Sequence, residues 1–265
     1  MKIILCAAMV LDPRLPLSFF ESNLLNGELT LPPDTPFVLS PFDEYALELA
    51  LKIKDEEASI ITTITLGPPK AKEVLRHTLA MGADEAILIK DDEFGELDSF
   101  GKAQVLSSVI KVLGEYDLIL CGMQAADLDY GQVGPLISLN LDIPLINVAK
   151  KIEPAPGGVR VQRSFEDGDE ILEAPTPLLV TVGDEGGIPR LRSGMGTIRA
   201  ARATIPEWSS SDLGLQPTDV YKPLLNGKKL FIPPKPNQTC TFIEAGSPES
   251  MGKRLAEIIH EEYMI

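Results

Sequence analysis

The sequence has little positive charge, few cysteines and no long hydrophobic run. Its 24 lysines and arginines stand against 39 aspartates and glutamates. The resulting net charge of −15 argues against a nucleic-acid partner, because phosphate binding depends on clustered basic residues. Cys6, Cys121 and Cys240 form no CxxC pair, so a disulfide framework or zinc site is not expected and a reducing, cytoplasmic location fits best. No run approaches the roughly 20 apolar residues of a membrane span.

Motifs of the common catalytic classes are also missing. The chain has no GxGxxG, no GxxxxGK[ST] and no GxSxG. Its two histidines, His77 and His260, stand near no serine or cysteine in a triad arrangement, and no metal site is expected from them. The sequence therefore predicts a protein that holds a cofactor, and it gives no sign of acid–base or nucleophilic catalysis.

Short apolar runs alternate with helical patterns in the first half of the chain. The opening MKIILCAAMV has no cleavage site after it and is expected to form a buried first strand. Pro41 and Asp43 after Ser40 predict a capped helix start, with Asp43 reaching back as in a capping box. The expected strands are residues 3–10, 59–66, 86–89 and 117–121, and the expected helices are residues 42–54, 74–81 and 101–113. This alternation predicts βαβ units and a parallel sheet.

The second half of the chain has a different pattern. Residues 145–165 predict an antiparallel hairpin, residues 177–182 one more strand, and residues 184–199 an exposed loop that leads into a short basic helix. Several prolines from Trp208 onward predict an extended arm that ends in an amphipathic helix after Ser247. We therefore divide the chain into a nucleotide-binding α/β domain, 1–206, and a C-terminal arm, 207–265.

The stretch DLILCGMQAADLDYGQVGP, residues 117–135, is the candidate site. If the first and fourth strands are neighbours, the loop after Cys121 borders a crevice of the kind that binds nucleotides. Gly131 and Gly134 would let the backbone approach a pyrophosphate at a helix start. Asp127 and Asp129 would then face ribose hydroxyls or close the loop. Two alternatives remain open: a Mg²⁺ site built on the two acids, and a structural turn with no ligand.

From the first strand to about residue 215 the chain resembles the beta subunit of electron-transfer flavoproteins. The resemblance is carried by residues 40–56, 67–89, 117–135 and 178–193, and most specifically by TLAMGAD and the GMQAADLDYGQVG loop. It implies a Rossmann-like domain of the adenine nucleotide alpha-hydrolase-like class, with a small antiparallel extension. It also implies a heterodimer with an alpha subunit that holds a redox-active FAD, around which the arm wraps.

The resemblance implies an adenine nucleotide in the crevice: AMP in the ordinary type, or a second FAD in electron-bifurcating types that oxidise NADH. Gln132-Val133-Gly134-Pro135 is closer to the bifurcating type, which favours FAD over AMP, and Ser40 replaces the asparagine of the ordinary type. The implied nucleotide contacts are Cys6, Ser40, Pro41, Phe42, Asp43, Leu66, Gln124, Ala125, Asp127, Asp129, Tyr130, Gly131, Gln132, Val133 and Gly134.

Residues 184–199 correspond to the loop that docks flavin-dependent dehydrogenases such as acyl-CoA dehydrogenases through a leucine. The implied partner contacts are Arg190, Arg192, Gly194 and Met195, and Gly194 stands at the leucine position, so a different dehydrogenase is possible. The competing hypothesis is a stand-alone adenine-nucleotide sensor on the same fold. The apolar stripe of the last helix argues against a monomeric sensor, because it needs something to cover it.

Overall fold

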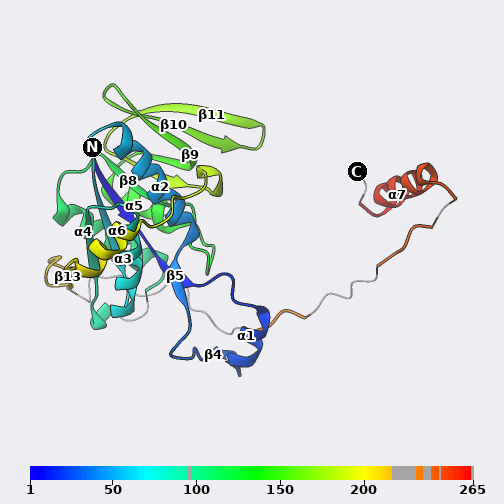
Figure 1. Ribbon diagram of the computed structural model, residues 1–265, viewed down its shortest axis with the longest axis horizontal. Helices are drawn as coiled ribbons and strands as arrows, with labels where there is room; N and C mark the ends of the chain where they lie inside the picture. The colour runs from blue at the N-terminus through cyan, green and yellow to red at the C-terminus, as the bar shows by residue number, and fades with distance from the viewer. Residues whose placement is uncertain (95–96, 217–230, 235–239, 245, 264–265) are drawn as a thin grey trace. The chain divides into compact units, whose positions relative to one another are not determined.

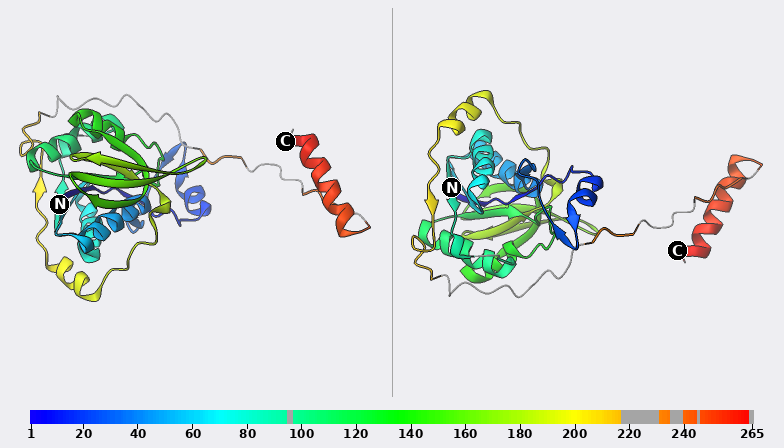
Figure 2. Two further views of the ribbon diagram at one scale, coloured as in Figure 1. Left: turned by 90° about the horizontal axis from the view of Figure 1, so that it is seen from above. Right: turned by 90° about the horizontal axis from the view of Figure 1, so that it is seen from below.

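The computed structural model describes residues 1–94, 97–216, 231–234, 240–244 and 246–263 (Figure 1). The chain divides into two compact units, residues 1–229 and residues 230–265. The first unit carries a large sheet with helices on both faces (Figure 2). Two small two-stranded sheets accompany it, β2 with β5 and β3 with β4.

The large sheet has nine strands in the order β11-β10-β9-β12-β8-β1-β6-β7-β13. β10 is antiparallel to β9 and β11, and every other neighbouring pair is parallel. This confirms the predicted α/β class with an antiparallel extension. The strands are β1 Lys2–Cys6, β6 Ile60–Leu66, β7 Glu85–Ile89, β8 Leu118–Gly122, β9 Leu145–Ala155, β10 Gly158–Phe165, β11 Gly168–Pro175, β12 Leu178–Val182 and β13 Glu207–Trp208.

Buried side chains on both faces of the sheet explain why its central strands β1 and β8 are almost wholly apolar. Along β1, Ile3 and Leu5 belong to one core cluster, and Ile4 and Cys6 belong to the cluster on the opposite face. The first cluster is covered by α2 Pro41–Glu56 and α3 Lys72–Met81, and the second by α4 Ser99–Leu113 and α5 Val133–Leu141. The remaining elements of this unit are α1 Leu17–Asn23, β2 Met9–Leu11, β3 Leu24–Leu25, β4 Glu28–Leu29, β5 Phe37–Leu39, η1 Pro69–Ala71, η2 Asp92–Phe94, η3 Asp184–Gly186 and α6 Gly194–Arg202.

The crevice lies where the order of the strands reverses. From β1 the chain builds outward through β6 and β7, and it then returns to place β8 on the other side of β1. Leu5 of β1 is paired with Leu120 of β8, so the first and fourth apolar runs are neighbours, which is the condition on which the expected crevice depended. At such a switch point the loops after the two strands lead to opposite faces and leave a crevice at their carboxyl ends.

The first strand is shorter than predicted. β1 ends at Cys6, and residues 9–11 form β2, which pairs with β5 in a separate antiparallel sheet. The chain turns away because the Ala8 N–H donates to Asp43 Oδ2, at 2.8 Å. The predicted capping box is therefore wrong: Asp43 bonds to the sheet edge, and buried Ser40 Oγ has no hydrogen-bond partner among the described residues.

The third antiparallel strand, β11, has no counterpart in the sequence prediction. Its sequence GDEILEAP has acidic residues on both sides and no buried position, so neither β-propensity nor alternation indicates a strand. Cross-strand ion pairs stabilise it, since Arg160 and Arg163 of β10 bond to Glu173 and Glu170 opposite them.

Residues 207–216 belong to the first unit. β13 pairs with β7 at the sheet edge, and Leu213 and Leu215 contact the core cluster. In the second unit α7, Pro248–Tyr263, follows Ser247, whose Oγ accepts the Ser250 N–H as the predicted cap. The assignment of residues 207–265 to an arm that packs on a partner stays a prediction. No helix of the described ranges combines the length and the apolar character of a membrane span.

Candidate functional site

A cavity of about 160 Å³ occupies the crevice at the carboxyl ends of β1, β6 and β8. Its walls come from the β1–β2 turn, the first turn of α2, the end of β6, the first half of α4 and the loop that joins β8 to α5. Its lining residues are Cys6, Ala7, Ala8, Met9, Asp43, Leu66, Ser99, Lys102, Leu106, Cys121, Gly122, Met123, Gln124, Ala125, Asp127, Leu128, Tyr130, Gly131, Gln132, Val133 and Gly134.

The cavity brings together eleven of the fifteen residues that the resemblance implies. They are Cys6, Asp43, Leu66, Gln124, Ala125, Asp127, Tyr130, Gly131, Gln132, Val133 and Gly134. The other four lie outside the lining. Ser40 and Pro41 begin α2 beside Asp43, and Phe42 lies against Gly122. Asp129 lies in the loop and accepts a hydrogen bond from Gln124.

Asp43 joins three walls of the cavity. Its Oδ2 accepts the Ala8 N–H at 2.8 Å, and its Oδ1 accepts the Gly122 N–H at 2.7 Å. A Cβ on Gly122 would lie only 2.5 Å from Phe42 Cβ, so a glycine is needed for α2 to approach β8 this closely. Burial raises the pKa of Asp43 to about 7, against the lowering effect of its two backbone hydrogen bonds.

The loop between β8 and α5 is closed by its own polar groups. The Asp129 N–H donates to Ala125 O, and Gln124 Nε2 donates to Asp129 Oδ1 at 3.0 Å. Asp127 Oδ1 accepts the Leu128 N–H at 2.8 Å. Asp129 and Gly131 adopt left-handed backbone conformations, with φ of 53° and 62°. The two acids of the loop thus close it, one of the two roles expected of them.

The start of α5 supplies two N–H donors to the cavity. Within the described chain, the N–H groups of Val133 and Gly134 have no acceptor, and both residues line the cavity. Gly134 also has a packing role, beside the phosphate approach that stays a prediction. A Cβ there would lie 2.9 Å from both Cys121 Sγ and Thr181 Cγ2, so the missing side chain lets the helix approach the sheet.

The two cysteines of the cavity are packed thiols. Cys6 and Cys121 are buried on the neighbouring strands β1 and β8. Burial raises the pKa of both, and the Asp43 carboxylate adds to the effect. Thiols of this kind are poor nucleophiles.

Sequence reasoning missed the wall that α4 contributes. Ser99, Lys102 and Leu106 occupy one face of this helix and line the cavity. A topological argument would have found them, because the helix between two parallel strands begins at the carboxyl edge where the first strand ends. Apolar pattern alone gives no reason to single out Lys102.

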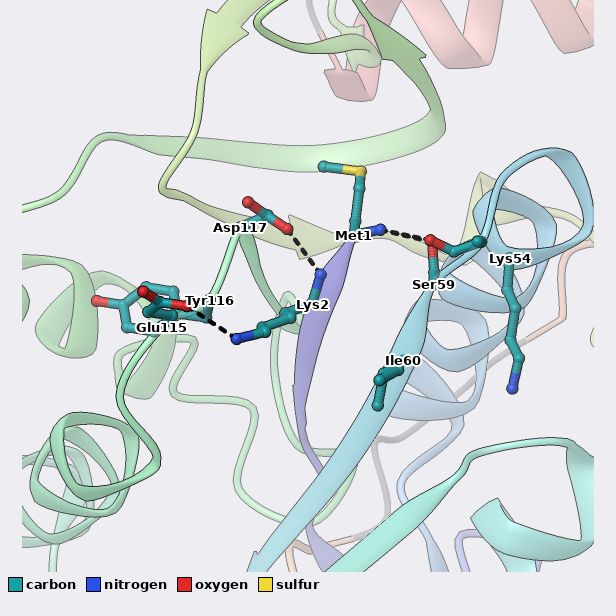
Figure 3. A pocket seen from close by; sticks show the side chains of 9 residues that line it. Met1, Lys2, Lys54, Ser59, Ile60, Glu115, Tyr116 and Asp117 are labelled. Atoms are coloured by element: carbon teal, nitrogen blue, oxygen red, sulfur yellow. Dashed lines mark hydrogen bonds and ion pairs between the residues drawn. The ribbon is translucent and has the colours of Figure 1, made fainter.

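A second, larger hollow of about 680 Å³ lies at the amino ends of β1 and β6, away from the crevice (Figure 3). Its polar groups pair with one another. Lys2 Nζ bonds to Glu115, the Lys2 N–H donates to Asp117 Oδ2, and the Met1 amino group donates to Ser59 Oγ. Backbone amides at helix starts face the carboxyl edge of a parallel sheet, so this hollow lacks the donors that the crevice has.

The predicted partner loop leaves several apolar side chains in solvent. Ile188 and Leu191 are each 93% exposed, and Met195 at the start of α6 is 78% exposed. Arg190 instead turns back onto α2, where its N–H and guanidinium bond to Glu48 and Asp55. These partners raise the pKa of Arg190.

Arg192 and Gly194 complete the predicted set. Both are exposed, and an added Cβ on Gly194 would meet no atom within 4 Å. The loop therefore separates into an anchor, Arg190, and an exposed part that includes Leu191 three residues before the position at which a leucine was expected.

The fold and crevice define an α/β domain of the doubly wound type, with its cavity at the topological switch point. The model of the electron transfer flavoprotein domain matches residues 30–213, and the chain belongs to this family as a beta subunit.

Three relatives illustrate the range of the family. The beta subunit of electron transfer flavoprotein from Megasphaera elsdenii is 38% identical over 212 residues, covering 76% of this chain and 77% of the relative. The caffeyl-CoA reductase-Etf complex subunit CarD from Acetobacterium woodii is 37% identical over 226 residues, covering 82% of this chain and 81% of the relative. Protein FixA from Azorhizobium caulinodans is 31% identical over 239 residues, covering 86% of this chain and 84% of the relative.

Proposed function

We propose that this beta subunit holds an adenine nucleotide in the cavity at the β1–β8 switch point. It would pair with an alpha subunit that carries a redox-active FAD, and the heterodimer would pass electrons between a flavin-dependent dehydrogenase and an acceptor. One observation carries the proposal: eleven of the residues that the family resemblance implies line a single cavity, beside two N–H groups at the start of α5 that have no acceptor among the described residues.

The residues of the cavity suit an adenine nucleotide chemically. Leu66, Leu106 and Met9 offer apolar surface to a base, and Gln124 and Gln132 offer amide groups. The start of α5 favours an anion through its free N–H groups and its dipole. A bound flavin would supply reversible storage of one or two electrons, and this chain would bind, orient and shield it.

We further propose FAD over AMP as the nucleotide of this subunit, with NADH as an electron donor and electron bifurcation as the activity. Gln132-Val133-Gly134-Pro135 at the start of α5 motivates this choice. The cavity of about 160 Å³ is smaller than the ~300 Å³ at which typical ligand pockets begin. The chain alone would therefore enclose only part of a dinucleotide, and the alpha subunit would cover the rest.

The test is the nucleotide content of the heterodimer purified with its alpha partner. Extraction and chromatography should give two FAD per heterodimer, and anaerobic NADH should bleach the flavin absorbance. One FAD with one AMP and no reduction by NADH would refute bifurcation and retain the electron carrier. A heterodimer with no nucleotide beyond the FAD of the alpha subunit would refute the assignment of the cavity.

The same purification tests the sensor hypothesis. A sensor should be a stable monomer with bound adenine nucleotide when the chain is expressed alone, and it should not bind an alpha subunit in size-exclusion chromatography. The exposed apolar residues of α7, which are Met251, Leu255 and Ile259, favour the heterodimer.

A further inference from the structure

Lys102 occupies a position in the cavity wall that the proposed function does not explain. Among the described residues that line the cavity, it is the sole lysine or arginine, and two acidic residues, Asp43 and Asp127, line the same cavity. The chain as a whole carries a net charge of −15, so the positive charge of a lysine in the cavity wall is opposite in sign to that of the protein as a whole.

The fold directs Lys102 toward the cavity. Ser99, Lys102 and Leu106 follow one another at helical spacing on α4, so they share the face that borders the cavity. Ser99 and Leu106 are buried beneath it, whereas Lys102 is exposed. A long side chain on a buried face can keep its stem against the wall while its charge reaches the opening.

The ammonium group of Lys102 has no carboxylate partner in the part of the chain that the structure describes. Lys54, Lys72 and Lys90, by contrast, each pair with an acidic side chain. The acids of the cavity are engaged by other groups, since Asp43 accepts two backbone N–H groups and Asp127 accepts one. Lys102 is therefore available for an anion that enters the cavity from outside.

We infer that Lys102 binds the phosphate of the nucleotide and makes the cavity select nucleotides over nucleosides. This inference rests on the proposed function. Lys102, Val133 and Gly134 line the same cavity, and together they can offer a phosphate one full positive charge and two backbone N–H donors. A nucleoside has the same base and ribose but no phosphate, so it gains nothing from Lys102.

The experiment compares AMP with adenosine as probes on the nucleotide-depleted heterodimer, by isothermal titration. Lys102→Gln should weaken AMP binding about five- to tenfold, the range of one partly exposed charge-assisted contact, and leave adenosine binding unchanged. Lys102→Arg should restore most of the AMP affinity. The loss of AMP affinity with added salt should also be smaller in Lys102→Gln than in the wild type.

Lys111 provides the matched control. It lies nine residues further along α4, roughly two and a half turns, and so on the opposite face of the same helix. Lys111→Gln should leave both AMP and adenosine affinity unchanged. The inference is overturned if Lys102→Gln and Lys111→Gln behave alike, or if Lys102→Gln weakens AMP and adenosine equally. A wild-type heterodimer that binds neither probe would refute the proposed function itself.

Discussion

Replacing Gly134 by alanine tests whether this glycine serves the packing of α5 on the sheet. The new Cβ would lie 2.9 Å from Cys121 Sγ and from Thr181 Cγ2, closer than such atoms approach, so the helix or these two side chains must shift. Overpacking of this kind costs about 1–3 kcal/mol, and the better helix propensity of alanine returns up to about 1 kcal/mol. We expect a net loss of about 1–2 kcal/mol in the free energy of unfolding.

Urea unfolding of the purified chain measures this loss as a midpoint lowered by about 0.5–1 M, for a slope near 2 kcal/mol per M. Gly194→Ala is the control, because Gly194 also lies in the first turn of a helix and a Cβ there meets no atom. Cys121→Ala with Thr181→Ser removes both clashing atoms and should rescue Gly134→Ala in stability and nucleotide content. The packing argument fails if Gly134→Ala is as stable as Gly194→Ala, or if the rescue has no effect.

Three further changes test other contacts. Arg190→Ala should lower stability by about 2 kcal/mol, because it leaves the buried carboxylate of Glu48 unpaired, and adding Glu48→Gln should recover part of the loss in urea unfolding. Burial raises the pKa of Asp43 to about 7 from an ordinary 3.8, so the free energy of unfolding of the wild type should fall as the pH rises between these two values. Asp43→Asn should not show this fall. Urea midpoints of the two proteins that change equally between pH 5 and 8 would refute this prediction. Leu255→Ser on α7 should weaken the heterodimer about tenfold by titration, and Lys253→Ser should leave its affinity unchanged.

The parts of the fold that the sequence predicted are those in which local pattern and tertiary environment agree. After Lys2, β1 is a continuous apolar run because both faces of the sheet are covered there. α3 ends where predicted, at Gly82, which adopts a φ of 139° that other residues rarely reach. β11 escaped prediction because its strand character comes from pairing with β10 and from ion pairs, and neither can be read from residues 168–175 alone.

The candidate site was predictable to the extent that it lies on one loop. Residues 124–134 are contiguous and include two glycines, so this loop could be identified from the sequence. Asp43 was assigned to a cap because nothing in the local sequence shows that residues 8 and 122 approach it. Lys102 could be predicted as a cavity residue only from the strand order, since the return of the chain to β8 brings the start of α4 to the same edge of the sheet as the loop after β8.

The crevice has an acidic loop, although the helix start beside it favours an anion. The hydrogen bonds that the acids accept explain how the two can occur together. Asp43 accepts N–H groups from two strand ends, Asp127 accepts one from its own loop, and Asp129 accepts the Gln124 amide. A carboxylate that accepts such hydrogen bonds holds the backbone in place, and the partial positive charge of the donors offsets part of its negative charge. Among the described residues, the groups of the cavity without hydrogen-bond or ion-pair partners include the first N–H groups of α5 and the ammonium of Lys102. Under the proposed function, the acids would shape the walls and these donors would bind the phosphate.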